Sequence, residues 1–475
     1  MGGWDLRFPE ALWQQLRQHL FPGDGDEHGA VVGASVVESA RGTRLLACTL
    51  HLAVDGVDYV PGQRSYRMLT PAFVRDSVLA CRDEGLAYLA IHCHGGRDTV
   101  GFSPPDLASH ERGYPALRDI AGQVVGAVVF ATNAAAGDLW LPDGHRVALT
   151  RATIVGRVIR TLYPTPPTPP IPDPTYDRQA RLFGDRGQAL LQNQKVGVIG
   201  VGGAGSLIVE YLARLGVGHL VVVDPDRVET SNLPRIVGSS RRDALPWLTA
   251  DQRPAFVRRL ARRFTRPKVS VARRVARQAN PRIVVEEICG DIVDDAVAQR
   301  LTDCDYLFLA ADPMQTRLMF NALVHQYGIP GTQVGAKVRV DLDSGEILDV
   351  YSVVRPVSPG SGCLWCNGLI SPARLQDEAL SAAERARQHY VDDSTVTVPS
   401  VITLNAVAAA HAVDDYLFRV TGLLDEDVPH RYLRFLPREV DVCFETPRRD
   451  PSCSECGAGP QGRLSRGQQR RLPTR

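Results

Sequence analysis

A glycine-rich turn between two apolar strands constrains the fold of this chain most. Residues Gly200–Ser206 read Gly-Val-Gly-Gly-Ala-Gly-Ser, and they follow the β-prone run Lys195–Gly200. Glycine lets the backbone turn tightly and approach a phosphate, and the helix expected from Ser206 would point its free N–H groups at that anion. Asp224 lies 19 residues after Gly205, at the end of the next predicted strand, where an acid reaches a ribose hydroxyl. This order predicts a nucleotide site built from the following residues: Gly200, Gly202, Gly203, Gly205, Asp224 and Asp226.

Apolar runs alternate with helical stretches through residues 176–445. Leu220–Asp224, Ile283–Ile288 and Tyr306–Ala310 are β-rich, and helical sequence separates them. Such alternation predicts an α/β domain with a parallel, doubly wound, Rossmann-like sheet. Residues 1–162 instead alternate short apolar runs with turns and contain one clear amphipathic helix at Thr70–Glu84. That pattern predicts an α+β domain.

A proline run divides the two patterns. Residues 163–174 read Tyr-Pro-Thr-Pro-Pro-Thr-Pro-Pro-Ile-Pro-Asp-Pro, which forms neither a helix nor a central strand and acts as a stiff spacer. At 475 residues the chain is also too long for a single ordinary core. We therefore predict a first domain at 1–162, a linker at 163–175 and a second domain at 176–457. Residues 458–475 are rich in Gly, Pro, Gln and Arg, so we expect a disordered basic tail.

Composition excludes several classes of partner. The net charge of +1 gives no general attraction to nucleic acid or to membranes, and no run approaches the ~18 apolar residues of a membrane span. The first residues have no apolar signal core, which favours a cytoplasmic protein. In that setting the ten cysteines are expected to be metal ligands or buried thiols rather than disulfides.

Four short segments carry a family resemblance. They are Tyr176-Asp-Arg-Gln179, Ser231-Asn-Leu-Pro-Arg235, Arg266-Pro-Lys-Val269 and Ala310-Ala-Asp312. In this order they resemble signatures of the ThiF/MoeB/E1 superfamily, which uses ATP to adenylate the C-terminus of ubiquitin-like and sulfur-carrier proteins. The resemblance covers residues 176–457.

The resemblance implies roles for individual residues. Arg235 and Lys268 would bind the phosphates of ATP, because two anions must meet when a carboxylate attacks the α-phosphorus. Asp312 would hold Mg²⁺, and Asn232 would position the nucleotide. The residue matching Arg178 reaches the ATP of the partner subunit in this family, which implies a homodimer.

Two Cys-x-x-Cys pairs predict a structural zinc site. Four thiolates in two close pairs suit tetrahedral Zn²⁺, and a closed four-thiolate shell is structural rather than catalytic. The segment Asn367–Ser400 contains no cysteine, whereas thioester-forming members of the superfamily carry one there. We therefore expect the acyl-adenylate to pass directly to an E2-like or sulfur-transfer protein, and we expect the thiols of Cys289, Cys304 and Cys443 to be buried. The predicted zinc ligands are Cys363, Cys366, Cys453 and Cys456.

A second metal site is predicted in the first domain. His92 and His94 end an apolar strand at positions i and i+2, which share one face and can bind the same ion. Asp106 follows in the first turn of a helix that Ser103 should cap. Two histidines and one carboxylate leave a position for water, which is the layout of catalytic zinc. Glu27, ahead of the first core strand, is the candidate general base.

This second pattern resembles the JAB/MPN family of zinc isopeptidases with the JAMM motif, over roughly residues 8–160. The resemblance implies that His92, His94 and Asp106 hold zinc and that Ser103 stabilises a tetrahedral intermediate. Two departures stand out: eight residues separate His94 from Ser103 where the family usually has seven, and Gly95 replaces the usual proline.

Together these features predict a fused enzyme of a prokaryotic ubiquitin-like system that processes a ubiquitin-like protein and adenylates its C-terminal carboxylate. The alternative is activation and trimming of a sulfur carrier in cofactor or amino-acid biosynthesis. The chain has lysine only at 195, 268 and 337, which favours conjugation, while the missing cysteine favours sulfur transfer. Two weaker readings are an NAD-dependent oxidoreductase and a scaffold with an inactive first domain.

Overall fold

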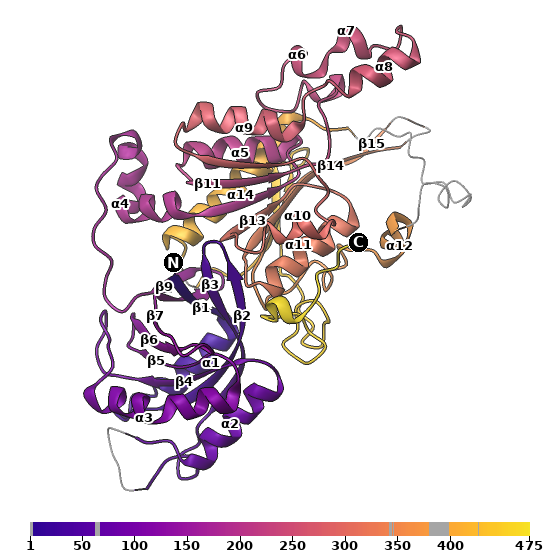
Figure 1. Cartoon of the computed structure of the whole chain (residues 1–475). Coiled ribbons are helices and arrows are strands. Elements are labelled where there is room, and N and C mark those ends of the chain that lie inside the picture. Colours follow the sequence, from indigo (N-terminus) through magenta and orange to yellow (C-terminus); the bar gives the residue numbers. More distant parts are fainter. Residues whose placement is uncertain (1–2, 62–66, 342–343, 345, 380–398, 426) are drawn as a thin grey trace. The chain divides into compact units, whose positions relative to one another are not determined.

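The structure is a computed structural model that describes residues 3–61, 67–341, 344, 346–379, 399–425 and 427–475. The chain divides into two compact units. The first comprises Met1–Pro169, His325–Gly328 and Pro451–Arg471, and the second comprises Pro170–Val324, Ile329–Asp450 and Leu472–Arg475. The break between residues 169 and 170 falls inside the proline run that we predicted to be a linker. Figure 1 labels the elements of both units.

The first unit is built on a mixed nine-stranded sheet. Its strand order is β7-β6-β5-β4-β2-β3-β1-β8-β9, with helices α1, α2 and α3 between strands (Figure 1). This arrangement of helices and a mixed sheet agrees with the predicted α+β class. The elements are β1 (Gly3–Pro9), α1 (Glu10–Leu20), β2 (Gly29–Ser39), β3 (Gly42–Leu52), α2 (Pro71–Asp83), β4 (Ala87–Cys93), α3 (Pro104–Ala121), β5 (Val125–Phe130), β6 (Ala135–Trp140), β7 (Arg146–Leu149), β8 (Arg151–Val155) and β9 (Ile159–Leu162).

Local sequence signals set the helix starts in this unit. Thr70 caps α2, since its side chain accepts the Phe73 N–H, and it is the first residue of the helix predicted at Thr70–Glu84. Ser103 caps α3 in a capping box: its Oγ accepts from the Asp106 N–H, and the Asp106 carboxylate accepts from the Ser103 N–H at 2.8 Å. The position of Asp106 is therefore fixed by the start of the helix that carries it.

The second unit is built on an eight-stranded sheet ordered β12-β11-β10-β13-β14-β15-β16-β17. The first five strands are parallel and the rest antiparallel. The strands are β10 (Lys195–Ile199), β11 (His219–Val223), β12 (Val284–Ile288), β13 (Tyr306–Leu309), β14 (Gly331–Val340), β15 (Ile347–Val357), β16 (Tyr432–Leu436) and β17 (Asp441–Glu445). The α-helices are α4 (Asp177–Asn193), α5 (Gly203–Arg214), α6 (Arg241–Ala244), α7 (Pro246–Thr249), α8 (Ala255–Arg262), α9 (Lys268–Ala279), α10 (Asp295–Gln299), α11 (Met314–Gln326), α12 (Pro372–Ala379) and α14 (Ile402–Thr421).

This sheet confirms the predicted Rossmann-like architecture. All four predicted parallel strands are present, and each begins and ends within one residue of its predicted bounds. β10 lies between β11 and β13, so the chain order reverses at β10. In open parallel sheets such a reversal leaves a crevice at the carboxyl ends of the strands, where ligands bind.

The prediction of a disordered tail at 458–475 disagrees with the structure. The Ser465 carbonyl accepts hydrogen bonds from Ser35 Oγ at 2.5 Å and Cys48 Sγ at 3.1 Å, within the first unit. Gly467 opens a short 3-10 helix, η3 (Gly467–Gln469), and its carbonyl accepts from the Gln326 side chain at 2.7 Å. The polar composition suggested disorder, but the backbone carbonyls of Ser465 and Gly467 accept hydrogen bonds from side chains of the first unit.

No helix in the described part of the chain combines the length and the apolar character that a membrane crossing requires.

Candidate functional site

Glycines shape the turn between β10 and α5. Gly200 has a φ of +85°, a left-handed conformation that favours glycine, and its N–H donates to the Val223 carbonyl. A Cβ on Gly205 would lie 1.9 Å from the Gly200 carbonyl oxygen, and a Cβ on Gly203 would lie 2.3 Å from the Asn405 side-chain nitrogen. The backbone of the turn therefore excludes a side chain at Gly205, whereas at Gly203 the Asn405 side chain would have to move.

The predicted acid at the end of β11 holds the loops around this turn. One Asp224 oxygen accepts the Val201 N–H at 2.9 Å, and the other accepts the Asp226 N–H at 2.9 Å. Burial raises the pKa of Asp224, and the nearby Lys268 ammonium opposes that rise. Lys268 Nζ lies 2.6 Å from Asp226 Oδ2. The carboxylate thus joins the glycine turn to the loop that follows β11.

A cavity of about 570 Å³ opens at the carboxyl ends of these strands. Most residues predicted for the nucleotide site line it, and they come from five separate segments of the second unit. The predicted residues in its wall are Gly200, Gly202, Gly203, Asp224, Asp226, Arg235, Lys268 and Asp312.

Three predicted residues do not line the cavity. Gly205 is buried against the backbone of Gly200, so its role is packing. Asn232 is buried, and its side-chain oxygen accepts the Glu229 N–H at 3.1 Å, which stabilises the turn before Arg235. Arg178 is exposed on α4.

Asp312 lies just beyond β13 with its side chain almost fully exposed to solvent. Its Oδ1 is 3.6 Å from the Arg317 guanidinium on α11. An exposed carboxylate in the cavity wall retains oxygen lone pairs that suit Mg²⁺, a hard cation that prefers oxygen ligands.

The cavity also contains residues that the sequence analysis missed. Glu378 on α12 accepts the backbone N–H groups of Met314 and Gln315, at 2.8 and 2.9 Å. Asn405 on α14 and Arg475 also line the wall. Of these, Asn405 alone has a signal in the sequence, as a polar residue in the mostly apolar stretch Ile402–Ala412.

The predicted metal ligands of the first unit lie together. His92 Nε2 and His94 Nε2 are 3.2 Å apart, and Asp106 Oδ2 lies 3.6 and 3.4 Å from them. Ligands of tetrahedral zinc lie about 3.3 Å apart, because zinc–nitrogen distances are about 2.0–2.1 Å. The three ligand atoms therefore have the mutual spacing of a metal site.

Strand pairing and a carbonyl orient this group. β2 pairs with β4 so that Gly29 lies opposite His92, which brings the preceding Glu27 to the histidines. His94 Nδ1 lies 3.1 Å from the Gly101 carbonyl oxygen. Because a carbonyl only accepts, Nδ1 carries the proton and Nε2 keeps its lone pair for a metal.

Glu27 and Ser103 lie beside the ligands. Glu27 Oε1 is 3.7 Å from His94 Nε2, and burial raises the pKa of this carboxyl, while the charges of His94 and His92 oppose the rise. Ser103 Oγ donates to Asp106 Oδ2 at 2.6 Å. Burial alone would raise the pKa of Asp106, but the neighbouring His92 and the hydrogen bonds from Ser103 hold it below its usual value.

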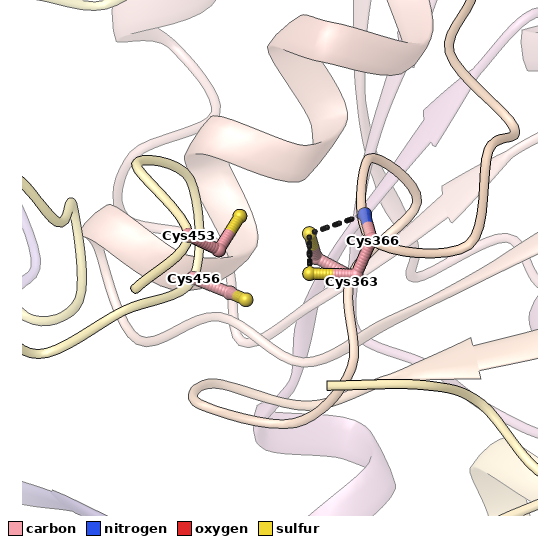
Figure 2. Close-up of side chains that lie close together, drawn as sticks. All are labelled: Cys363, Cys366, Cys453 and Cys456. Atoms are coloured by element: carbon pink, nitrogen blue, oxygen red, sulfur yellow. Dashed lines mark hydrogen bonds between the residues drawn. The ribbon is translucent and has the colours of Figure 1, made fainter. Parts of the chain in front are cut away.

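The four predicted zinc-binding cysteines also meet. Figure 2 shows their sulfur atoms facing one another, and all lie within 4.8 Å of one another. Cys366 N–H donates to Cys363 Sγ at 3.3 Å, and Glu455 N–H donates to Cys453 Sγ at 3.4 Å. Backbone N–H groups aimed at sulfur stabilise thiolates, so the donor set fits Zn²⁺.

The expectation that the remaining thiols of the second unit are buried is partly wrong. Cys304 is buried, but Cys443 is half-buried and Cys289 is exposed. Cys289 directly follows β12 at the carboxyl edge of the sheet, where the chain leaves the core.

Known proteins resemble the second part of the chain. Residues 176–457 match the ThiF family. The SAMP-activating enzyme E1 of Haloferax volcanii is 33% identical over 280 residues, which cover 58% of this chain and 85% of that protein. The sulfur carrier protein ThiS adenylyltransferase of Bacillus subtilis is 29% identical over 219 residues, covering 42% of this chain and 56% of that protein. The molybdopterin-synthase adenylyltransferase of Salmonella typhimurium is 31% identical over 168 residues, covering 35% and 59%. The family match leaves out residues 1–175.

Proposed function

The chain belongs to the ThiF family, and from that premise we propose that it uses ATP to adenylate the C-terminal carboxylate of a ubiquitin-like or sulfur-carrier protein. One observation carries the proposal. Arg235, Lys268 and Asp312 line the same cavity as the glycine turn. Adenylation has a use for both cations and for the exposed acid beside that turn, whereas hydride transfer to or from a dinucleotide would leave the exposed acid without a role.

The proposed step is a displacement at the α-phosphorus of ATP. An oxygen of the carboxylate bonds to that phosphorus, the bond to the bridging oxygen breaks, and pyrophosphate leaves with the bonding electrons. Arg235 and Lys268 would neutralise the phosphates while the two anions meet. Asp312 would hold Mg²⁺, which adds positive charge beside the same oxygens.

The test is ATP–pyrophosphate exchange with purified ubiquitin-like and sulfur-carrier proteins from the same genome. We expect exchange with at least one of them and its loss in Arg235→Ala. Arg277→Ala is the matched control, because Arg277 is exposed on α9 and does not line the cavity. Absence of exchange with every carrier, with Mg²⁺ present, would refute the proposal.

We further propose a homodimer in which Arg178 acts on the partner's nucleotide. Arg178 is exposed on α4 and does not line the cavity of its own subunit. Mixing Arg178→Ala and Asp312→Asn subunits, each inactive alone, should restore part of the exchange activity.

The four clustered cysteines would hold one structural zinc in each chain.

For the first unit we propose a JAMM-type zinc peptidase that trims or releases the same carrier. His92, His94 and Asp106 would hold zinc, which would supply an activated water. Glu27 would accept the proton of that water. The extra residue before Ser103 lies in the irregular segment 94–103, and the ligand atoms still meet.

The peptidase test uses a carrier with a C-terminal extension. We expect wild type to cleave it and Glu27→Gln to bind zinc without cleaving. Cleavage by Glu27→Gln would contradict the role of Glu27, and an uncleaved carrier with wild type would favour a scaffold with an inactive first domain.

Conjugation and sulfur transfer differ in the protein that next accepts the activated carrier. Supplying either an E2-like protein or a sulfur-transfer protein to the adenylate therefore separates the two pathways.

A further inference from the structure

Three short helices interrupt the sheet-and-helix pattern between the two predicted phosphate-binding residues. Residues 241–264, here called the arm, contain α6, α7 and α8, which Figure 1 shows grouped together in the second unit. Arg235 precedes the arm and Lys268 follows it, and both line the nucleotide cavity. The arm thus leaves the cavity wall and returns to it.

The arm exposes an apolar stripe. Phe256, Leu260 and Phe264 are spaced four residues apart, which places them along one side of α8 and its C-terminal turn. Their exposed fractions are 74%, 56% and 71%. Of the residues one position later, Val257 is half-buried and Ala261 and Thr265 are buried, so α8 packs through one face and presents a second apolar face to solvent. Exposed aromatic residues gathered in this way mark interaction sites.

The stripe lies in strongly basic sequence. Residues 252–280 contain ten arginines and lysines and no aspartate or glutamate. Within the part of the chain that the structure describes, Arg259, Arg262 and Arg263 are exposed, and their side chains form no ion pair. Arginine presents a planar fork that binds carboxylates through two hydrogen bonds.

The base of the arm is anchored. Asp243 at the end of α6 pairs with Arg274 on α9 at 2.8 Å and with Arg266 at 3.1 Å. The Lys268 N–H donates to the Asp226 carbonyl at 3.0 Å, and Asp226 lies in the cavity wall. These contacts tie the position of the arm to the nucleotide cavity.

We propose that the arm is the docking surface for the carrier protein, through an acidic face that surrounds an apolar patch. The proposal rests on the adenylation function proposed above. Phe256 and Phe264 bury against the apolar patch, and the arginines pair with surrounding carboxylates, which matches the aromatic and arginine anchors that dominate protein interfaces. A lipid surface would also attract a basic apolar helix. The carrier is the better occupant because Arg235 before the arm and Lys268 after it line the cavity where its carboxylate would react.

The test measures carrier binding to the full-length chain by fluorescence anisotropy, with a panel of ubiquitin-like and sulfur-carrier proteins that differ in surface charge. We expect an acidic member to bind, and Phe256→Ser/Phe264→Ser to weaken its binding at least tenfold. Ile171→Ser is the apolar control, since Ile171 is 94% exposed outside the arm. Arg259→Glu should weaken binding several-fold, while Arg277→Glu on α9 should not. Thermal unfolding checks that all variants remain folded.

Several outcomes would overturn the proposal: no panel member binds wild type, the serine double variant binds as wild type does, or wild type binds anionic phosphatidylserine vesicles or itself through the arm. ATP–pyrophosphate exchange separates the two proposals. Exchange with an unchanged KM for the carrier in the serine variant would remove the docking role and leave adenylation intact. Carrier binding that depends on the arm, without any ATP–pyrophosphate exchange, would remove the adenylation function and leave the docking role intact.

Discussion

The Lys268 ammonium lies between two acids of the proposed nucleotide cavity, 2.6 Å from Asp226 Oδ2 and 3.7 Å from Asp224 Oδ1. The lysine begins α9, and the acids follow β11, so the pair links two segments more than forty residues apart. These carboxylates hold the ammonium at the cavity wall, where phosphate oxygens would compete for it.

Lys268→Met should lower kcat/KM for ATP–pyrophosphate exchange about 100-fold, because one cation facing the phosphates is lost. Lys268→Arg retains the charge and should recover part of the activity. Lys337→Met is the control, since Lys337 is exposed on β14 and does not line the cavity. Equal losses of kcat/KM in Lys268→Met and Lys337→Met would contradict the phosphate-binding role of Lys268.

Two glycines of the turn should respond differently to alanine. Gly205→Ala places a Cβ 1.9 Å from the Gly200 carbonyl oxygen, which should cost about 1–3 kcal/mol and lower the unfolding temperature of the second unit by roughly 5 °C. A Cβ at Gly202 would meet no protein atom within 4 Å, so Gly202→Ala should leave the unfolding temperature unchanged and lower the affinity for ATP instead. Calorimetry with and without ATP measures both effects. A larger unfolding shift for Gly202→Ala would contradict this division.

Zinc content should separate the two proposed metal sites. We expect two zinc ions per chain in wild type and one in Cys363→Ser, because three thiolates no longer close the shell. His92→Ala should also contain one, retained at the cysteines. Cys443→Ser is the matched control, since Cys443 lies outside the cluster. Elemental analysis of purified protein gives the counts, and a wild type with one zinc that is lost in Cys363→Ser would leave the histidine site without metal.

Asp5→Asn should destabilise the first unit by about 3–5 kcal/mol at pH 7. Asp5 is buried, bonded to Arg7 at 3.0 Å, Arg151 at 3.2 Å and Thr153 at 2.7 Å, and the variant leaves a buried guanidinium without its anion. Burial raises the pKa of Asp5, but the arginines and Thr153 lower it below its ordinary value of 3.8.

The sign of this shift fixes the pH window. A depressed carboxyl pKa contributes stability that is fully present above 3.8 and is lost as the pH falls through the folded value. The difference in urea midpoint between wild type and Asp5→Asn should therefore stay constant from pH 7 to 5 and shrink at pH 3. A gap that is equally wide at pH 3 would show that packing, and not the charge, stabilises β1.

Local signals predicted much of the fold. The parallel strands follow from β-rich runs with bounding turns, and the starts of α2 and α3 follow from Thr70 and Ser103 with proline behind each. In both cases the determining interactions join residues close in sequence. The same holds for His92 and His94, whose spacing on one strand face sets their separation.

Residues brought in from distant segments could not be predicted in this way. Glu378 reaches the start of α11 from 63 residues away, and nothing near it in the sequence marks that destination. We predicted a disordered tail because composition does not reveal that the Ser465 carbonyl accepts a hydrogen bond from Ser35, 430 residues earlier. The exposed stripe on α8 could not be predicted for a different reason. Apolar periodicity shows that a helix has an apolar face, but it does not show whether other residues cover that face.

The carboxylate of Asp106 serves two structures at once. It closes the capping box of α3 through the Ser103 N–H, and the same oxygen lies 3.4 Å from His94. The rotamer entropy of this proposed zinc ligand is thus already lost when the helix forms, before any ion would bind. Metal entry should accordingly require little ordering of α3, and the amide hydrogens of Ser103 and Asp106 should exchange slowly even in chelator-treated protein.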